Sequence, residues 1–168
     1  MADAVQVREA RAEDREVLLD LHERLYVGQR DRVVDRSDLP LIDYHDYEQV
    51  LADDLAALMA DRSAVVLVAE SGEGILGYIT GRVRVESRRV LPRRGVVEDW
   101  YVAEQARGTG IGRALLLELE RRLTSRGCDV IESATWAGND EARKAHEALG
   151  FREIRVLYRK RSRAADVD

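Results

Sequence analysis

The stretch that decides the fold is Gln105-Ala-Arg-Gly-Thr-Gly-Ile-Gly-Arg113, a glycine-rich turn between two apolar runs. Residues 96–102 before it have the pattern of a strand, and residues 114–123 after it have helical spacing. Glycine lets the backbone approach a ligand closely, and the first N–H groups of a helix are free to bind an anion. The helix dipole favours negative charge at the same point. The sequence therefore predicts a site for a phosphate-bearing ligand.

Three known phosphate-binding loop motifs can be compared with this stretch. A nucleotide-hydrolysing P-loop needs Lys-Ser or Lys-Thr after the glycines, and neither follows here. A dinucleotide loop needs Gly-x-Gly-x-x-Gly, whereas glycines 108, 110 and 112 are spaced Gly-x-Gly-x-Gly. The pattern Gln/Arg-x-x-Gly-x-Gly/Ala fits at every fixed position, so the chain resembles the GNAT superfamily of acyl-CoA-dependent N-acetyltransferases. A turn that binds nothing is the remaining alternative, although three alternating glycines cost conformational entropy.

Composition indicates one globular domain, which we place at residues 1–163, followed by a polar tail at 164–168. The single cysteine, Cys128, excludes an intramolecular disulfide, so we expect a reducing, cytoplasmic location. No apolar run is long enough for a membrane span, and the first residues do not have the pattern of a signal peptide. A net charge of −5 argues against nucleic acid as a partner. The sequence has no cluster of His and Cys with the spacing of metal ligands, so no metal site is expected.

The charge is unevenly distributed along the chain. Residues 1–64 hold 16 Asp or Glu against eight Arg, whereas residues 82–94 hold six Arg against Glu86. The acidic segment and the basic segment could both be solvated surface. The functional interpretation is an acidic surface that attracts cationic amines and a basic segment near an anion.

Hydrophobic periodicity and turn residues predict six strands and four helices. The strands are expected at 5–8, 64–70, 75–85, 96–102, 129–135 and 151–160. The helices are expected at 11–26, 44–61, 110–126 and 139–149, with a loop at 27–41 and a basic connector at 87–95. This order favours an α/β (α+β) fold with a mixed, mostly antiparallel sheet, parallel only where a helix crosses over. The GNAT resemblance implies the same fold, with a splayed parallel pair and about four flanking helices.

The resemblance also implies how acetyl-CoA, the co-substrate, would bind. Its pyrophosphate would rest on Arg107, Gly108, Thr109, Gly110, Ile111, Gly112 and Arg113. Its pantetheine arm would pair with the backbone of Trp100, Tyr101 and Val102, where one N–H would polarise the thioester carbonyl. A second motif begins at Asn139, the expected helix cap, and ends in Leu-Gly-Phe151. It implies that Asn139 and Ala142 also contact the cofactor.

A pair of carboxylates is the candidate for removing a proton from the amine before it attacks the thioester. Alternation along the strand places Glu98 and Asp99 on opposite faces, so only one of them is expected to face the cleft. The run Glu-Asp-Trp-Tyr-Val is similar to that of small-amine acetyltransferases, which implies Glu98 as the base and a supporting or substrate-binding role for Asp99. The alternative is that Glu98 pairs with Arg82 or Arg84.

His146 is the candidate for protonating the leaving thiolate. The second motif departs from the superfamily pattern at this position, where Tyr is usual and often serves as the acid. An imidazole can donate a proton near neutral pH. The alternative is that His146 only packs along the CoA arm.

A narrower resemblance links residues 145–160 to the C-terminal part of aminoglycoside 6′-N-acetyltransferases. That group carries Ser-Asp-Thr where this chain has Ser133-Ala-Thr135, so one plausible amine-binding carboxylate is missing. An acidic cleft could be lined by Asp43, Asp46, Glu48, Asp53 and Asp54. The acceptor therefore stays open among aminoglycosides, polyamines, amino acids and peptides.

The expected activity is transfer of an acetyl group from acetyl-CoA to a primary amine of a small cationic acceptor, by direct attack in a ternary complex. No pattern for a covalent acyl-enzyme was found. A peptide or protein amine acetyltransferase, a non-catalytic acyl-CoA-binding module and a dinucleotide-dependent enzyme are the alternatives. The resemblance also allows a homodimer.

Overall fold

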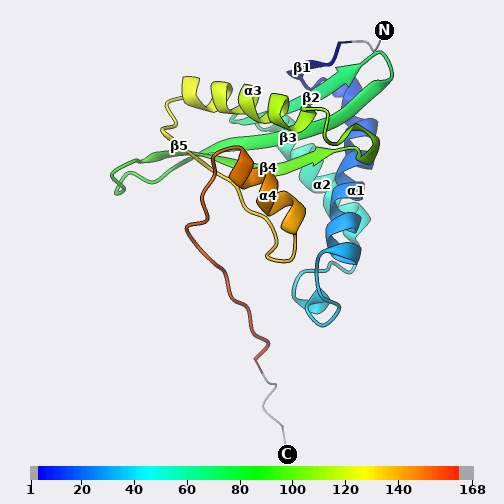
Figure 1. Ribbon diagram of the computed structural model, residues 1–168, viewed down its shortest axis with the longest axis vertical. Helices are drawn as coiled ribbons and strands as arrows, with labels where there is room; N and C mark the ends of the chain where they lie inside the picture. Colours follow the sequence, from blue (N-terminus) through cyan, green and yellow to red (C-terminus); the bar gives the residue numbers. More distant parts are fainter. Residues whose placement is uncertain (1–3, 163–168) are drawn as a thin grey trace, which may run out of the picture.

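A computed structural model describes residues 4–162 and contains one five-stranded sheet in the order β1-β2-β3-β4-β5 (Figure 1). The strands are β1 (Gln6–Glu9), β2 (Ala64–Ser71), β3 (Gly74–Val85), β4 (Arg93–Val102) and β5 (Val130–Glu132). The helices are α1 (Arg15–Arg32), α2 (Tyr47–Ala60), α3 (Ile111–Ser125) and α4 (Asp140–Ala148). Short 3₁₀ turns lie at η1 (Ala12–Asp14), η2 (Leu39–Leu41) and η3 (Glu104–Ala106). Strands β1 to β4 are antiparallel neighbours and β5 is parallel to β4, as the sequence predicted.

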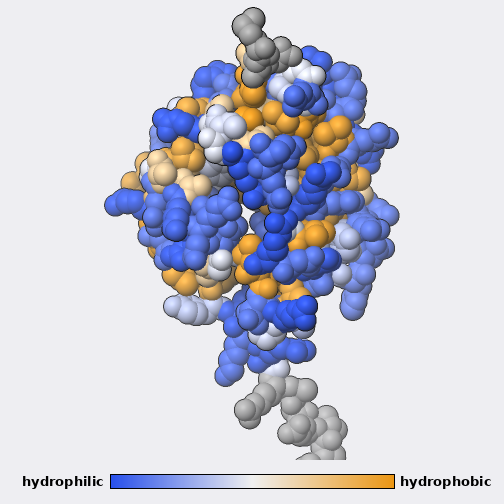
Figure 2. All heavy atoms as spheres, turned by 45° about the vertical axis from the view of Figure 1, so that its right-hand side comes forward, coloured by the Kyte–Doolittle hydropathy of each residue, from blue (hydrophilic) through white to orange (hydrophobic). Residues whose placement is uncertain are grey.

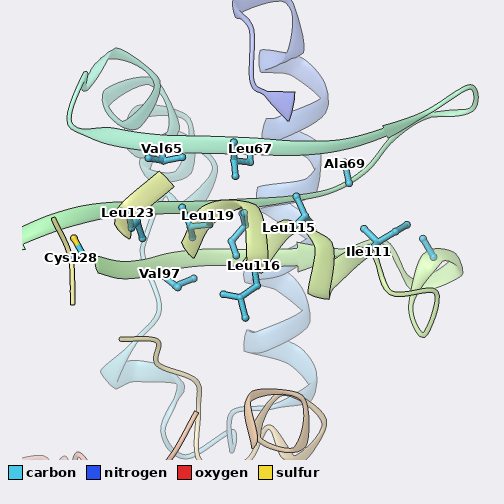
Figure 3. Close-up of a cluster of buried hydrophobic side chains, with 12 residues drawn as sticks. Val65, Leu67, Ala69, Val97, Ile111, Leu115, Leu116, Leu119, Leu123 and Cys128 are labelled. Atoms are coloured by element: carbon cyan, nitrogen blue, oxygen red, sulfur yellow. The ribbon is translucent and has the colours of Figure 1, made fainter. Parts of the chain in front are cut away.

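Helix α3 covers one face of the sheet, and α1 and α2 cover the other (Figure 1). The apolar side of α3 packs onto β2, β3 and β4, as Figure 3 shows for Leu115, Leu119 and Leu123 over Val65 and Val97. A second cluster joins α1 and α2 to the other face. Both faces of the sheet are therefore covered by apolar contacts.

Glycines in the strands let α3 approach the sheet. A Cβ at Gly81 would lie 2.9 Å from the Val96 carbonyl oxygen and 3.1 Å from Leu119. Backbone cannot move aside easily, so Gly81→Ala should reduce the free energy of unfolding by about 1–3 kcal/mol. Gly28, inside α1, has open space around its Cβ position, so Gly28→Ala should stabilise by about 0.5–1 kcal/mol through helix propensity. Urea denaturation measures the free energy of unfolding of both variants. Equal changes in the two variants would contradict the close packing of α3 at Gly81.

The parallel pair separates soon after it forms. Its ladder runs from Arg94 opposite Val130 to Val96 opposite Glu132, while β4 continues to Val102. Within residues 4–162, the β5-side edge of residues 97–102 therefore has no strand beside it. Its backbone groups can pair with an extended ligand, as backbone does at any open sheet edge.

Three expectations about the elements were wrong. Helix α1 continues to Arg32, because residues 27–32 hold no proline and their weak periodicity reflects a half-exposed helix rather than a loop. Strand β5 spans three residues instead of 129–135, because β4 diverges beyond Val96. Residues 151–160 form no strand, since an alternating pattern becomes a strand only where an edge is within reach. The polar tail expected at 164–168 lies outside the described residues.

Candidate active site

The glycine-rich loop leads directly into α3. Gly108 and Gly110 have φ of 75° and 90°, a left-handed conformation that favours glycine, and Gly110 is the N-cap of the helix. The Thr109 hydroxyl donates to the Ala106 carbonyl at 2.6 Å, which closes the turn. The first N–H groups of α3 have no partner within the helix and point out of its N-terminus. Since the Ile111 side chain is buried in the core, this residue offers a ligand only its backbone.

The loop lies against the open edge of β4. Arg107 donates from Nε to the Val102 carbonyl at 3.1 Å, and its guanidinium lies 5.8 Å from the centre of the Tyr101 ring. Gly112 faces Trp100, since a Cβ there would lie 3.6 Å from Trp100 Nε1. The predicted pyrophosphate loop and the predicted pantetheine strand are therefore adjacent, with the exposed Arg113 on the first turn of the helix.

Helix α4 closes the other side of this region. Asn139 caps it as predicted, because the Asn139 side chain accepts from the Ala142 N–H at 3.0 Å. Arg107 of the loop lies 3.8 Å from Glu141 in the first turn of α4. The cap residues and the loop thus belong to one surface. Figure 2 shows a hollow, rimmed mostly by hydrophilic residues, on the face that it turns forward.

His146 is held in one orientation. Its Nδ1 lies 2.6 Å from the Ala142 carbonyl oxygen, which can only accept, so Nδ1 carries a proton. Its Nε2 lies 2.7 Å from the Ser133 hydroxyl. The ring meets Trp100 and Phe151 edge-on, with centroids 5.4 and 5.2 Å apart. His146 is therefore placed beside the β4 edge, and Ser133, which the sequence did not single out for this purpose, is its second partner.

Replacing His146 with Asn should lower kcat by roughly tenfold if the ring protonates the thiolate. The loss falls below the usual range for general acids, because a thiol with a pKa near 8.5 is already a good leaving group. Ser133→Ala removes only the second partner of the ring and should change kcat less. Steady-state rates with saturating acetyl-CoA measure this, and an unchanged kcat in His146→Asn would leave the residue with a packing role.

A β-bulge places the two central carboxylates on the same face of the sheet. Thr80 of β3 is opposite Asp99 and Gly81 is opposite Val97, so Glu98 is an extra residue in β4 without a partner. Glu98 and Asp99 both line one cavity on the α1/α2 side. The expectation that alternation separates them was wrong, because a bulge interrupts the two-residue period of the strand.

Glu98 is engaged by two arginines. Its Oε1 lies 2.8 Å from Arg82 Nε and 3.3 Å from Arg84 Nη2. This is the ion-pair alternative that the sequence left open. Arg82 also approaches Asp61 at 3.5 Å, so Glu98 belongs to a charge network in the cavity wall.

Asp99 has a different environment. Thr80 donates to Asp99 Oδ2 at 3.0 Å and accepts from the Asp99 N–H at 3.0 Å. The other oxygen lies 3.8 Å from His22 Nδ1, which in turn contacts the Tyr78 hydroxyl at 2.8 Å. Burial raises the pKa of the Asp99 carboxyl, with His22 and Thr80 acting in the opposite direction. Burial also raises the pKa of Tyr78, so its hydroxyl stays neutral and can only hydrogen-bond.

Two adjoining cavities, of about 230 and 440 Å³, share His22, Asp54 and Asp99. The first continues between α1 and the segment after η2, where its lining includes Tyr26, Tyr44 and Trp136. Asp54 is one of the acidic residues that the sequence placed at a cleft. His22 and Trp136 were missed, since a lone His on a helix and a Trp in a loop carry no local motif.

The described part of the chain has no group of three or more His, Cys, Asp or Glu side chains that could hold a metal ion. None of its helices is long and apolar enough to cross a membrane.

A glycine-rich loop at a helix N-terminus, an open strand edge and a carboxylate-lined cavity meet at β4, an arrangement that suits transfer of an acyl group from a phosphate-bearing carrier. The chain belongs to the acetyltransferase (GNAT) family, whose model matches residues 18–151. It is accordingly an acetyl-CoA-dependent N-acetyltransferase. It is 33% identical over 111 residues to aminoglycoside N(6′)-acetyltransferase type 1 of Stenotrophomonas maltophilia, a match covering 63% of this chain and 72% of that protein. The namesake from Salmonella typhimurium is 31% identical over 121 residues, covering 70% and 83%.

Solved structures share the fold. Aminoglycoside N-acetyltransferase AAC(6′)-Iy in complex with CoA superposes with a TM-score of 0.76 at 18% identity, covering 98% of each chain. A predicted acetyltransferase from Clostridium acetobutylicum, solved with acetyl-CoA, has a TM-score of 0.74 at 17% identity, covering 94% of this chain and 96% of that one. At these identities the likeness supports the fold alone.

Proposed function

We propose that this enzyme transfers the acetyl group of acetyl-CoA directly to a primary amine of a small cationic acceptor. The observation that carries the proposal is that β4 separates two half-sites. Its open edge, from 97 to 102, adjoins the glycine loop, and its bulge presents Asp99 to the cavity on the α1/α2 side. An amine in that cavity and a thioester along that edge would meet at the same few residues, which favours attack in a ternary complex.

The cofactor half of the site would use mostly backbone. The free N–H groups at the start of α3, from Ile111 to Arg113, would hold the pyrophosphate, and Arg107 would add charge. Backbone of Trp100, Tyr101 and Val102 would pair with the pantetheine arm, and one N–H of this strand would polarise the thioester carbonyl.

The acceptor half of the site supports a cationic ligand. Arg82 is paired with Glu98 at 2.8 Å, and Arg30 with Asp31 at 2.7 Å. Within the described residues, Asp54 and Asp99 face the cavities without an Arg or Lys partner. Two carboxylates without guanidinium partners favour an ammonium ion, and Tyr26, Tyr44 and Trp136 offer ring faces beside it.

Asp99 is the stronger candidate for the base. Glu98, which the sequence favoured, has its carboxylate committed to Arg82 and Arg84. Asp99 faces the acceptor cavity, and its raised pKa brings it closer to the value at which a base works best. We therefore assign proton removal to Asp99 and assign to Glu98 the neutralisation of two arginines.

His146 remains the predicted acid, and the cytoplasmic location remains a prediction.

The acceptor class can be tested by thiol release from acetyl-CoA with a panel of aminoglycosides, polyamines, amino acids and basic peptides. The curated relatives named above are aminoglycoside acetyltransferases, whereas this chain has Ala134 where the resemblance expects an amine-binding Asp. We expect turnover with a small polyamine or aminoglycoside, and the mass of the product identifies the acetylated amine. Turnover confined to peptides would contradict the small-acceptor proposal.

A further inference from the structure

A nearly buried histidine adjoins the free oxygen of Asp99. Thr80 engages Asp99 through Oδ2 and through the backbone N–H, both at 3.0 Å, so Oδ1 is the oxygen left for a substrate. This Oδ1 lies 3.8 Å from His22 Nδ1. The His22 side chain is 11% exposed, and His22 lines both of the cavities proposed for the acceptor. Contacts that carry a proton are often this long in a free enzyme and tighten when the substrate binds.

Tyr78 of β3 holds the imidazole ring of His22 in place. The Tyr78 hydroxyl lies 2.8 Å from His22 Nδ1, and within residues 4–162 it has no other hydrogen-bond partner. Tyr78 is fully buried, and burial raises the pKa of its hydroxyl, so this group stays neutral and can either donate or accept. It can therefore donate to Nδ1 while the imidazole is neutral and accept from the Nδ1–H once the ring has gained a proton. Neither state leaves the buried hydroxyl without a partner.

A carboxylate alone is a weak base for an alkylammonium ion. The usual pKa is about 10.4 for the ammonium ion of a lysine, about 6.5 for an imidazole and about 3.9 for an Asp carboxyl. Asp99 therefore binds the proton much less tightly than the amine did, even though burial raises the pKa of this carboxyl. Transfer of the proton to an imidazole recovers part of the difference. A positive charge on His22 would share the two cavities with the carboxylates of Asp54 and Asp99.

We propose that His22 receives the proton that Asp99 removes from the amine. An N–H bond of the ammonium ion breaks and an O–H bond forms at Asp99 Oδ1. This O–H bond then breaks as an N–H bond forms at His22 Nδ1, so Asp99 is a carboxylate again. The imidazolium ion releases one proton to water and returns to its neutral form. The inference rests on the role proposed above for Asp99 and adds a second proton acceptor behind it.

Rates with amines of similar size and different basicity test this proton transfer. The probes are ethylamine and its monofluoro and difluoro derivatives, whose basicity falls in that order because fluorine withdraws electrons. The value of kcat/KM for each amine is measured at saturating acetyl-CoA in the wild type and in His22→Asn, whose amide can still accept from Tyr78. We expect a loss of roughly 10- to 100-fold with ethylamine and of about threefold or less with the difluoro amine, which gives up its proton readily to Asp99 alone.

A purely structural role of His22 would lower the rates with all three amines by the same factor. His22→Gln is a second variant, and a uniform loss in both variants, or no loss, would overturn the proposal. His45→Asn is the control, since His45 is exposed, lines neither cavity and should leave all three rates unchanged.

Asp99→Asn, measured with the same amines, separates this inference from the proposed base. Loss of turnover in Asp99→Asn with wild-type rates in His22→Asn would refute the transfer to His22 and leave Asp99 as the base. Near-normal turnover in Asp99→Asn would refute the assignment of the base, and the transfer to His22 with it.

Discussion

Replacing Asp99 with Asn is expected to lower kcat by about 10²- to 10⁴-fold, the usual contribution of a positioned general base. Asn keeps the shape of the side chain and can still accept from Thr80 at 3.0 Å, but it cannot take a proton. The fold should survive the change. Because burial raises the pKa of Asp99, the charged carboxylate costs stability that grows as pH rises through its folded-state pKa. At neutral pH the Asn variant should therefore unfold at the same temperature as the wild type or a higher one.

Glu98→Gln is the matched control. It leaves Arg82 and Arg84 without their carboxylate, so a cationic acceptor should bind less well and its KM should rise. The value of kcat should fall much less than in Asp99→Asn. A large loss of kcat in Glu98→Gln with near-normal turnover in Asp99→Asn would return the base to Glu98, as the sequence had suggested.

Removing a neighbouring negative charge from Asp99 should shift the pH dependence of the activity. The activity should rise with pH as Asp99 ionises, and its raised pKa places this limb above the usual value for Asp, about 3.9. The charge of Glu98 contributes to raising the pKa of Asp99. Glu98→Gln should therefore move the acid limb to lower pH, and Asp54→Asn should do the same, because Asp54 acts in the same direction.

Replacing Gly110 with Val is expected to weaken acetyl-CoA binding by roughly 30-fold or more, with a smaller change in kcat. Gly110 has φ of 90°, where an L-residue costs roughly 1–2 kcal/mol even without a branched side chain. The loop would relax to negative φ, and the N–H groups at the start of α3 would turn away from the phosphates. Recovering the binding conformation would then cost the relieved strain, which weakens the apparent affinity. Titration calorimetry with acetyl-CoA measures this.

Gly74→Val controls for strain as such. Gly74 has φ of 113° in the β2–β3 turn and open space around its Cβ position, as Gly110 has. Both variants should lose stability, but only Gly110→Val should lose affinity for acetyl-CoA. Equal losses of affinity would mean that the effect is general destabilisation rather than a damaged anion site.

Much of the fold could be predicted because its determinants are local. Leu115, Leu119 and Leu123 recur at helical spacing, and the hairpin of β2 and β3 is marked by its glycine turn. The prediction of a strand at residues 151–160 was wrong because its determinants are not local. Their alternating pattern is that of a strand, but pairing depends on an edge elsewhere in space, which no local pattern records.

The parts of the site whose backbone geometry is specified by a motif could be predicted from the sequence. The parts whose positions depend on tertiary packing could not. The glycine loop and the Asn139 cap are in place because positive φ and helix capping depend on one or two residues. The positions of Glu98 and Asp99 depend on a bulge, an insertion that the sequence of one strand cannot reveal. His22 reaches Asp99 only through tertiary packing of α1 on the sheet.

Amine-dependent release of free thiol from acetyl-CoA is the most direct test of acetyl transfer across β4. Initial rates should be measured while the concentrations of both substrates are varied. Direct attack in a ternary complex predicts no burst of thiol without amine, a rate that depends on both substrates, and double-reciprocal lines that intersect. Thiol release without amine, or parallel lines, would indicate a covalent acyl-enzyme and contradict the arrangement of two half-sites proposed for this protein.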